Sequence, residues 1–147
     1  MQLNRFTDYS LRVLIFLAVN RERLCTIQEI ADRFQLSKNH LMKIANELVR
    51  GGYVESARGR GGGLRLAGEP GDIPVGAVVR HCEGHIPFVE CLGCDVSTCI
   101  ISRKCTLKQV FARSLEALYQ VLDEYTVADL ADTEGEFLAR LLRSAQG

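Results

Sequence analysis

Apolar residues recur three and four positions apart over three segments in the first part of the chain, a spacing typical of amphipathic helices. The first segment covers residues 4–19. The second begins at Thr26, which Glu29 follows three residues later in the pattern of a capping box. The third begins at Ser37 and runs to about Arg50, where two glycines follow as they do at many helix ends. We therefore expect three helices, the last two joined by a tight turn.

Two short strand patterns come next, at residues 53–57 and 63–67. Between them lies the run Arg58-Gly59-Arg60-Gly61-Gly62, which predicts a hairpin with a basic, glycine-rich tip. Helix, helix–turn–helix and hairpin, in this order, make a winged helix-turn-helix. We expect a mainly α fold in which residues 1–70 form a winged helix-turn-helix DNA-binding domain with a two-stranded wing.

The second half of the chain predicts a short helix, a loop and a long helix. Pro74 opens the short helix, which ends near Cys82, and residues 83–101 have the irregular pattern of a loop. The long helix runs from about Ser102 to Glu124. Its apolar stripe consists of Leu107, Val110, Phe111, Leu115, Leu118, Val121 and Leu122.

A stripe of this length needs a second surface to cover it. A symmetric partner is the simplest such surface, and packing onto its own domain is the alternative. We therefore expect a homodimer. Residues 71–101 would form a short helix and a cysteine-containing loop, and residues 102–147 a long C-terminal dimerisation helix and a C-terminal segment with a last helix near residues 136–144.

The formal net charge of zero conceals an asymmetry between the two halves of the chain. Residues 1–70 carry 11 Lys and Arg against 7 Asp and Glu, and residues 71–147 carry 7 against 11. A basic N-terminal half is the electrostatic footprint of a nucleic-acid partner. No apolar stretch approaches the roughly 20 residues of a membrane span, and no signal-peptide pattern is present. We expect a cytoplasmic protein that binds double-stranded DNA and no membrane.

Polar side chains gather at the start of the third predicted helix and at the hairpin tip. The N-terminal end of a recognition helix meets base edges and phosphates in the major groove, and arginine is favoured in a narrow minor groove. The expected DNA-binding residues are Gln28, Ser37, Lys38, Asn39, His40, Lys43, Arg58 and Arg60. A solvated helix face and a flexible turn are the structural alternatives.

Four of the six cysteines lie in one short segment, Cys91-x2-Cys94-x4-Cys99-x5-Cys105. Thiolates are soft ligands, and groups of three or four select zinc or iron–sulfur centres. A structural zinc site usually pairs two tight knuckles, whereas this segment has one. The pattern favours a two-iron or four-iron cluster over a zinc site or a thiol redox switch.

Three residues outside this segment are candidates for a fourth, non-cysteine ligand: Asp8, His81 and His85. Of the other two cysteines, Cys82 is expected to be a small buried residue in the short helix, and Cys25 to be incidental. An iron–sulfur electron carrier would use the same loop but would leave the basic wing without a purpose. Because the sequence has no nucleotide motif and no acid–base constellation, we expect no enzyme.

Five stretches carry a resemblance to a known family. They are Leu3-Asn4-Arg5-Phe6-Thr7-Asp8-Tyr9-Ser10-Leu11-Arg12, Arg58-Gly59-Arg60-Gly61-Gly62-Gly63-Leu64-Arg65-Leu66, Val89-Glu90-Cys91, Cys99-Ile100-Ile101-Ser102-Arg103-Lys104-Cys105-Thr106-Leu107-Lys108, and Leu122-Asp123-Glu124-Tyr125-Thr126-Val127-Ala128-Asp129-Leu130. With them the chain resembles the Rrf-type winged-helix regulators over nearly its whole length, and most closely their nitric-oxide-sensing repressors.

The resemblance implies a homodimer that binds a palindromic operator and carries one iron–sulfur cluster per subunit, with nitric oxide as the effector that releases the DNA. It also implies three cysteine ligands, which match Cys91, Cys99 and Cys105, with Cys94 as the alternative first ligand by spacing. Asp8 matches a position that supplies the fourth ligand from the partner subunit. The iron–sulfur-assembly regulators of the family have a histidine shortly after the third cysteine, which this sequence lacks.

Overall fold

The structure is a computed structural model that describes residues 2–93, 99–132, 137 and 140–142. It confirms the mainly α winged-helix fold expected from the sequence. The elements, in chain order, are α1 (Arg5–Val19), α2 (Ile27–Phe34), α3 (Lys38–Arg50), β1 (Val54–Ala57), β2 (Gly63–Leu66), the 3-10 turn η1 (Pro70–Asp72), α4 (Val75–Glu83), the 3-10 turns η2 (Glu90–Leu92) and η3 (Ser102–Lys104), α5 (Thr106–Asp123) and α6 (Val127–Asp132).

Side-chain caps fix where the helices of the winged domain begin. The Thr26 hydroxyl accepts the backbone N–H of Glu29 at 3.1 Å, and the Ser37 hydroxyl accepts that of His40 at 3.1 Å. Between these two helices Gln35 adopts a left-handed conformation with φ of 54°, which makes the tight turn. The starts predicted for α2 and α3 are therefore confirmed, because the capping oxygens satisfy N–H groups that a helix leaves without partners.

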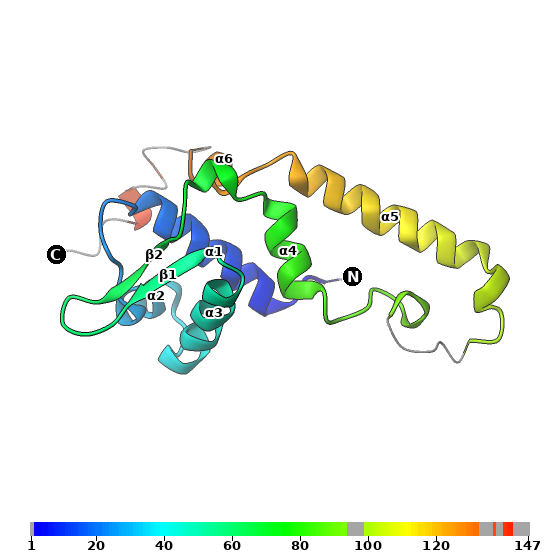
Figure 1. The fold of residues 1–147 in the computed structure, drawn as a ribbon, viewed down its shortest axis with the longest axis horizontal. Coiled ribbons are helices and arrows are strands. Elements are labelled where there is room, and N and C mark those ends of the chain that lie inside the picture. The colour runs from blue at the N-terminus through cyan, green and yellow to red at the C-terminus, as the bar shows by residue number, and fades with distance from the viewer. Residues whose placement is uncertain (1, 94–98, 133–136, 138–139, 143–147) are drawn as a thin grey trace.

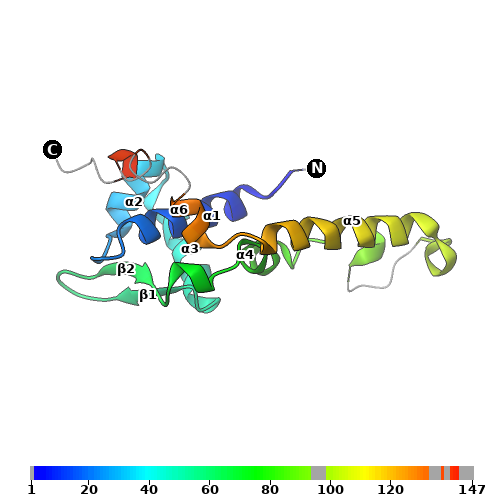
Figure 2. The ribbon, with the colours of Figure 1, turned by 90° about the horizontal axis from the view of Figure 1, so that it is seen from above.

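The core of the winged domain is built around α1, which contacts α3, α4, α6 and β2. Phe16, Leu14 and Val13 on α1 are fully buried. The two wing strands pair antiparallel, with Val54 opposite Leu66. The wing and α5 project from opposite ends of this core (Figures 1 and 2).

The long helix α5 contains no buried residue. It extends away from the winged domain in both views (Figures 1 and 2). Leu107 is 57% exposed, Val110 50% and Val121 55%. This part of the predicted apolar stripe is therefore open to solvent in the single chain.

The start predicted for the long helix near Ser102 is wrong. Residues Ser102–Lys104 form a 3-10 turn, and Cys105, with φ of −86° and ψ of 113°, is extended and precedes the first helical residue, Thr106. Ser102, Arg103 and Lys104 are polar and compatible with a helix, so the periodicity could not locate this break. The boundary between the predicted segments 71–101 and 102–147 is a separate matter and stays a prediction.

After α5 the chain returns to the winged domain. α6 packs against α1, and its Val127 is fully buried. Of the last helix predicted near residues 136–144, Phe137 and residues 140–142 are helical, and the remainder lies outside the described residues. Within the described part of the chain, no helix has the length and apolar character needed to cross a membrane.

Candidate DNA-binding surface and cysteine loop

The first turns of α3 present most of the predicted DNA-binding side chains to solvent. Ser37, Lys38, Asn39 and Lys43 are exposed. His40 is only half-exposed, because its ring packs edge-on against Tyr9 on α1, with 5.8 Å between ring centroids. Four of the five predicted residues in this segment are thus available to a duplex, and His40 helps to hold α3 against α1.

The start of α2 and the wing tip supply the other three predicted residues. Gln28 is exposed and its amide donates to Asp32 at 2.7 Å. Arg58 and Arg60 are exposed at the hairpin tip, separated by Gly59, which has φ of 93°. Only glycine adopts such a φ without strain, so the glycine between the arginines is needed to turn the chain there.

A groove of about 390 Å³ lies between α3, the start of α2 and the wing. Its α3 side includes Lys38, Met42, Asn46 and Val49. The sequence interpretation missed Met42 and Asn46, although both follow Lys38 at intervals of four and therefore share its helix face. Counting forward in fours from Lys38 reaches both residues.

The three cysteines expected as ligands lie in the cysteine loop, residues 84–105, which connects α4 to α5. Cys91 is half-buried in η2, Cys99 is exposed, and Cys105 is half-buried directly before α5. Cys94, the alternative first ligand, lies outside the described residues. Partly accessible thiols suit metal ligation, and this donor set fits an iron–sulfur cluster chemically. Within the described residues, however, no three His, Cys, Asp or Glu side chains gather closely enough to hold a metal ion.

The cysteines outside the loop have different surroundings. Cys25 is fully buried, and its backbone exchanges hydrogen bonds of 2.9 and 2.7 Å with Leu64 of the wing. Burial raises the pKa of the Cys25 thiol to about 11. Burial also raises the pKa of the half-buried Cys82 thiol. Cys25 is therefore a small core residue, whereas Cys82, expected to be buried, is only half-buried and packs against the edge of the core.

The candidates for a fourth ligand have other partners or are open to solvent. Asp8 forms an ion pair of 2.8 Å with Arg12 one turn later, and both side chains are about half exposed. His81 lies 2.9 Å from the Glu47 carboxylate of α3. His85 is exposed. The contact between His81 and Glu47 directs the His81 side chain toward α3. Asp8, by contrast, lies at an accessible position on α1.

The last turn of α4 joins three other helices just before the cysteine loop begins. Arg80 donates to both carboxylate oxygens of Asp123 on α5, at 2.9 and 2.6 Å, and its guanidinium lies 4.4 Å from the Tyr119 ring centroid. The hydrogen bond from Arg80 lowers the pKa of the Asp123 carboxyl. One residue further on, His81 contacts Glu47 of α3.

Glu83 completes these contacts at the start of α1. Its carboxylate accepts the backbone N–H of Asn4 at 2.8 Å and the hydroxyl of Thr7. The last four residues of α4 therefore contact α5, α3 and α1 through polar side chains. The sequence predicts this short helix and makes His81 a possible ligand, but nothing in the local pattern identifies partners so distant in the chain.

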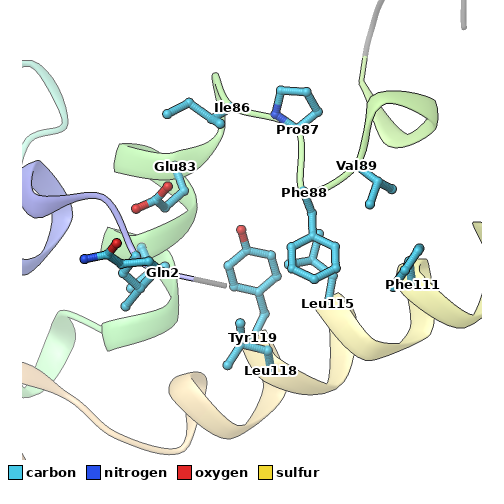
Figure 3. Close-up of a pocket in the computed structure, with 12 residues that line it drawn as sticks. Gln2, Glu83, Ile86, Pro87, Phe88, Val89, Phe111, Leu115, Leu118 and Tyr119 are labelled. Carbon is cyan, nitrogen blue, oxygen red and sulfur yellow. The ribbon is translucent and has the colours of Figure 1, made fainter.

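An apolar cavity of about 670 Å³ is lined by residues of α4, the first part of the cysteine loop and α5. Phe88 enters it from the loop and packs edge-on against Phe111 of α5, with 5.7 Å between ring centroids. Leu115 and Tyr119 line the α5 side, and Glu83 borders the α4 side (Figure 3). The first part of the loop thus packs on the same face of α5 that Arg80 contacts further along.

Comparison with known proteins gives a consistent result over nearly the full chain. The family model of Rrf2, described as an iron-dependent transcriptional regulator, matches residues 3–133. The chain is 47% identical over 142 residues to the HTH-type transcriptional regulator NsrR of Bacillus subtilis, covering 96% of this chain and 97% of that protein. It is 50% identical over 131 residues to the protein of the same name from Bacillus licheniformis, covering 88% and 92%.

Solved structures agree with these matches. CymR, the global cysteine regulator of Bacillus subtilis, superposes with a TM-score of 0.70 at 29% identity, covering 90% of this chain and 98% of that chain. IscR of T. potens superposes with a TM-score of 0.73 at 29% identity, covering 100% and 94%. The matches confirm the resemblance drawn from the sequence motifs, and the relatives are regulators rather than enzymes.

Proposed function

Because the chain belongs to the Rrf2 family of transcriptional regulators, and its relatives in that family are named NsrR, we propose that it is a repressor switched by nitric oxide. In this proposal a homodimer binds a palindromic operator in the cytoplasm. Cys91, Cys99 and Cys105 hold an iron–sulfur cluster, Cys94 being the alternative first ligand and Asp8 of the partner subunit the fourth. When bound, the cluster supplies iron that reacts with nitric oxide.

The DNA-binding part of the proposal rests on two exposed basic features of one domain. The N-terminal turns of α3 present Lys38, Asn39 and Lys43, and the wing tip presents Arg58 and Arg60. A recognition helix in the major groove and a basic wing on the adjacent minor groove would use both features. Two copies related by a two-fold axis would place them on successive turns of a palindrome, about 34–36 Å apart.

The homodimer is supported by the exposure of α5. Leu107, Val110 and Val121 are at least half exposed on a helix that projects from the domain. A second α5 would cover them in an isologous contact. The face with Phe111, Leu115 and Leu118 is already partly covered by α4 and the cysteine loop. Packing within the chain therefore accounts for part of the stripe, and the partner is proposed for the rest.

The observation that carries the switch is the position of α4 between the cysteine loop and the DNA-binding helices. The loop begins directly after Glu83, at a turn whose side chains contact α5, α3 and α1. A change in how the loop is held would shift this turn. His81 would pass the shift to Glu47 on the recognition helix, and Arg80 would pass it to Asp123 at the end of α5. The spacing of the two recognition helices would then change. A coupling of roughly 1–3 kcal/mol would alter operator affinity about 5–150-fold.

The visible absorption spectrum of anaerobically purified protein tests the cluster. We expect a broad thiolate-to-iron band that is lost in Cys105→Ala and retained in the control Cys82→Ala, since Cys82 is packed within α4 rather than in the loop. Wild-type protein that stays colourless after reconstitution with iron and sulfide would contradict the proposal. The cysteines would then serve as a zinc site or thiol switch.

A further inference from the structure

Met42 is the exposed apolar side chain within the first two turns of α3, where the other exposed side chains are polar. It is 45% exposed in the second turn of α3. Lys38 and Asn46 lie one helical turn before and after it, and Lys43 is its exposed neighbour. A buried position would explain a methionine at this point in the helix, but the structure leaves nearly half of the side chain open.

The groove between α3 and the wing provides the setting for this side chain. Met42 lines it together with Lys38, Asn46 and Ser56, and the described residues that line it include no carboxylate. Exposed Arg58 and Arg60 stand at the tip of the wing that forms its other side. A groove with cationic groups around it and no acidic group among its described lining matches a polyanion. Duplex DNA is therefore the occupant that its charge favours.

We infer that Met42 is a specificity-determining residue that reads the C5 methyl group of one thymine in each operator half-site. In the major groove only thymine presents a methyl group, and apolar side chains recognise it by contact. Lys38, Met42 and Asn46 lie on one face of α3. Lys38 and Asn46 are suited to polar base edges or phosphates, so Met42 is the one of these three side chains that can recognise a methylated pyrimidine edge. The inference rests on the proposed function in requiring a sequence-specific operator.

Substituting the methyl group on the DNA side gives a direct test. The operator is first selected from random duplexes with the loaded wild-type homodimer. Each thymine is then replaced by deoxyuridine, which removes only the C5 methyl group. We expect one position per half-site at which deoxyuridine weakens binding by about fourfold, the value of burying one methyl-sized group. With Met42→Ala the same replacement should have no effect.

Two further variants separate methyl recognition from general loss of contact. Met42→Leu keeps an apolar side chain and should retain the deoxyuridine penalty. Lys43→Ala should weaken binding to all duplexes and also retain the penalty. Because Met42 and Lys43 are exposed, these variants should fold as the wild type does, which thermal unfolding checks.

An equal deoxyuridine penalty in wild type and Met42→Ala would overturn the inference, as would an operator with no sensitive thymine. Either result would leave the repressor proposal intact: an equal penalty would mean that another residue contacts the methyl group, and no sensitive thymine would mean that the protein does not read this group. A selection that yields no preferred sequence would contradict the proposal of a sequence-specific operator, and therefore the inference as well.

Discussion

At the scale of single residues, burial separates the cysteines into two chemical classes. Cys25 is fully buried, and burial raises the pKa of its thiol to about 11. At pH 8 the thiol at this position would therefore stay protonated. Cys91, by contrast, is half-buried on the surface of the loop. Among the cysteines that the structure describes, Cys91, Cys99 and Cys105 combine accessibility with the spacing of a ligand set.

This difference predicts the order of alkylation in cluster-free, reduced protein. Brief treatment with iodoacetamide at pH 8 should modify Cys91 and leave Cys25 intact, because the thiolate is the reacting form and solvent does not reach Cys25. Peptide mass spectrometry measures both sites. In denaturant Cys91 and Cys25 should be alkylated to the same extent. Equal labelling in the native protein would show that Cys25 is not part of a closed core.

The cap at Ser37 fixes the start of the recognition helix, so its removal should lower stability. Ser37→Ala deletes the oxygen that accepts the His40 N–H. We expect the free energy of unfolding to fall by about 1 kcal/mol. Ser37→Asn, which retains a capping oxygen, should lose little. Urea denaturation compares the variants, and an unchanged value for Ser37→Ala would contradict the role of this cap.

At the scale of elements, the close approach of α4 and α5 determines how the cysteine loop is connected to the winged domain. Gly76 on α4 lies so near α5 that a methyl group there would overlap the Asp123 carboxylate and approach the Tyr119 carbonyl oxygen to 3.0 Å. The same carboxylate binds Arg80. An exposed ion pair of this kind adds little stability by itself, but it sets the position at which α5 leaves the domain.

Gly76→Ala should therefore uncouple operator binding from the state of the cysteine loop. We expect the ratio of operator affinities before and after nitric oxide to fall toward one, because Asp123 must move and the α4–α5 contact opens. Gly71→Ala is the matched control, since nothing lies within 4 Å of a methyl group at that position. A Gly76→Ala protein that folds and responds like wild type would rule out the α4–α5 contact as the link between the cysteine loop and operator binding.

Sequence patterns predicted the local features of the fold better than the contacts between distant elements. The caps at Thr26 and Ser37 were predictable because each acts within three residues. The partners of Arg80 and His81 were not, since they are more than thirty residues away and depend on how the helices pack. The break before Thr106 was missed because the stretch from residue 102 is compatible with a helix.

At the scale of the whole molecule, the projecting α5 is the element for which we propose a partner subunit. Val110 is half exposed on this helix. Because an isologous interface repeats every residue, Val110→Glu would place two carboxylates at the contact. We expect the dimer dissociation constant to rise by about a hundredfold or more, from the cost of burying unpaired charges. Analytical ultracentrifugation measures it.

The adjacent exposed position provides the control for this dimer test. Gln109→Glu adds the same charge on α5 outside the apolar stripe and should change the dissociation constant little. A monomeric wild type, or a Val110→Glu protein that dimerises normally, would contradict α5 as the dimer contact.

The central claim is that the cysteine loop controls operator binding in response to nitric oxide. The measurement that tests it most directly is operator affinity of the anaerobically reconstituted wild-type protein before and after nitric oxide, alongside Cys99→Ala. We predict a loss of about 5–150-fold for wild type, and weak, unresponsive binding for Cys99→Ala. Unchanged affinity of the wild type, or a Cys99→Ala protein that binds tightly and still responds, would contradict the claim.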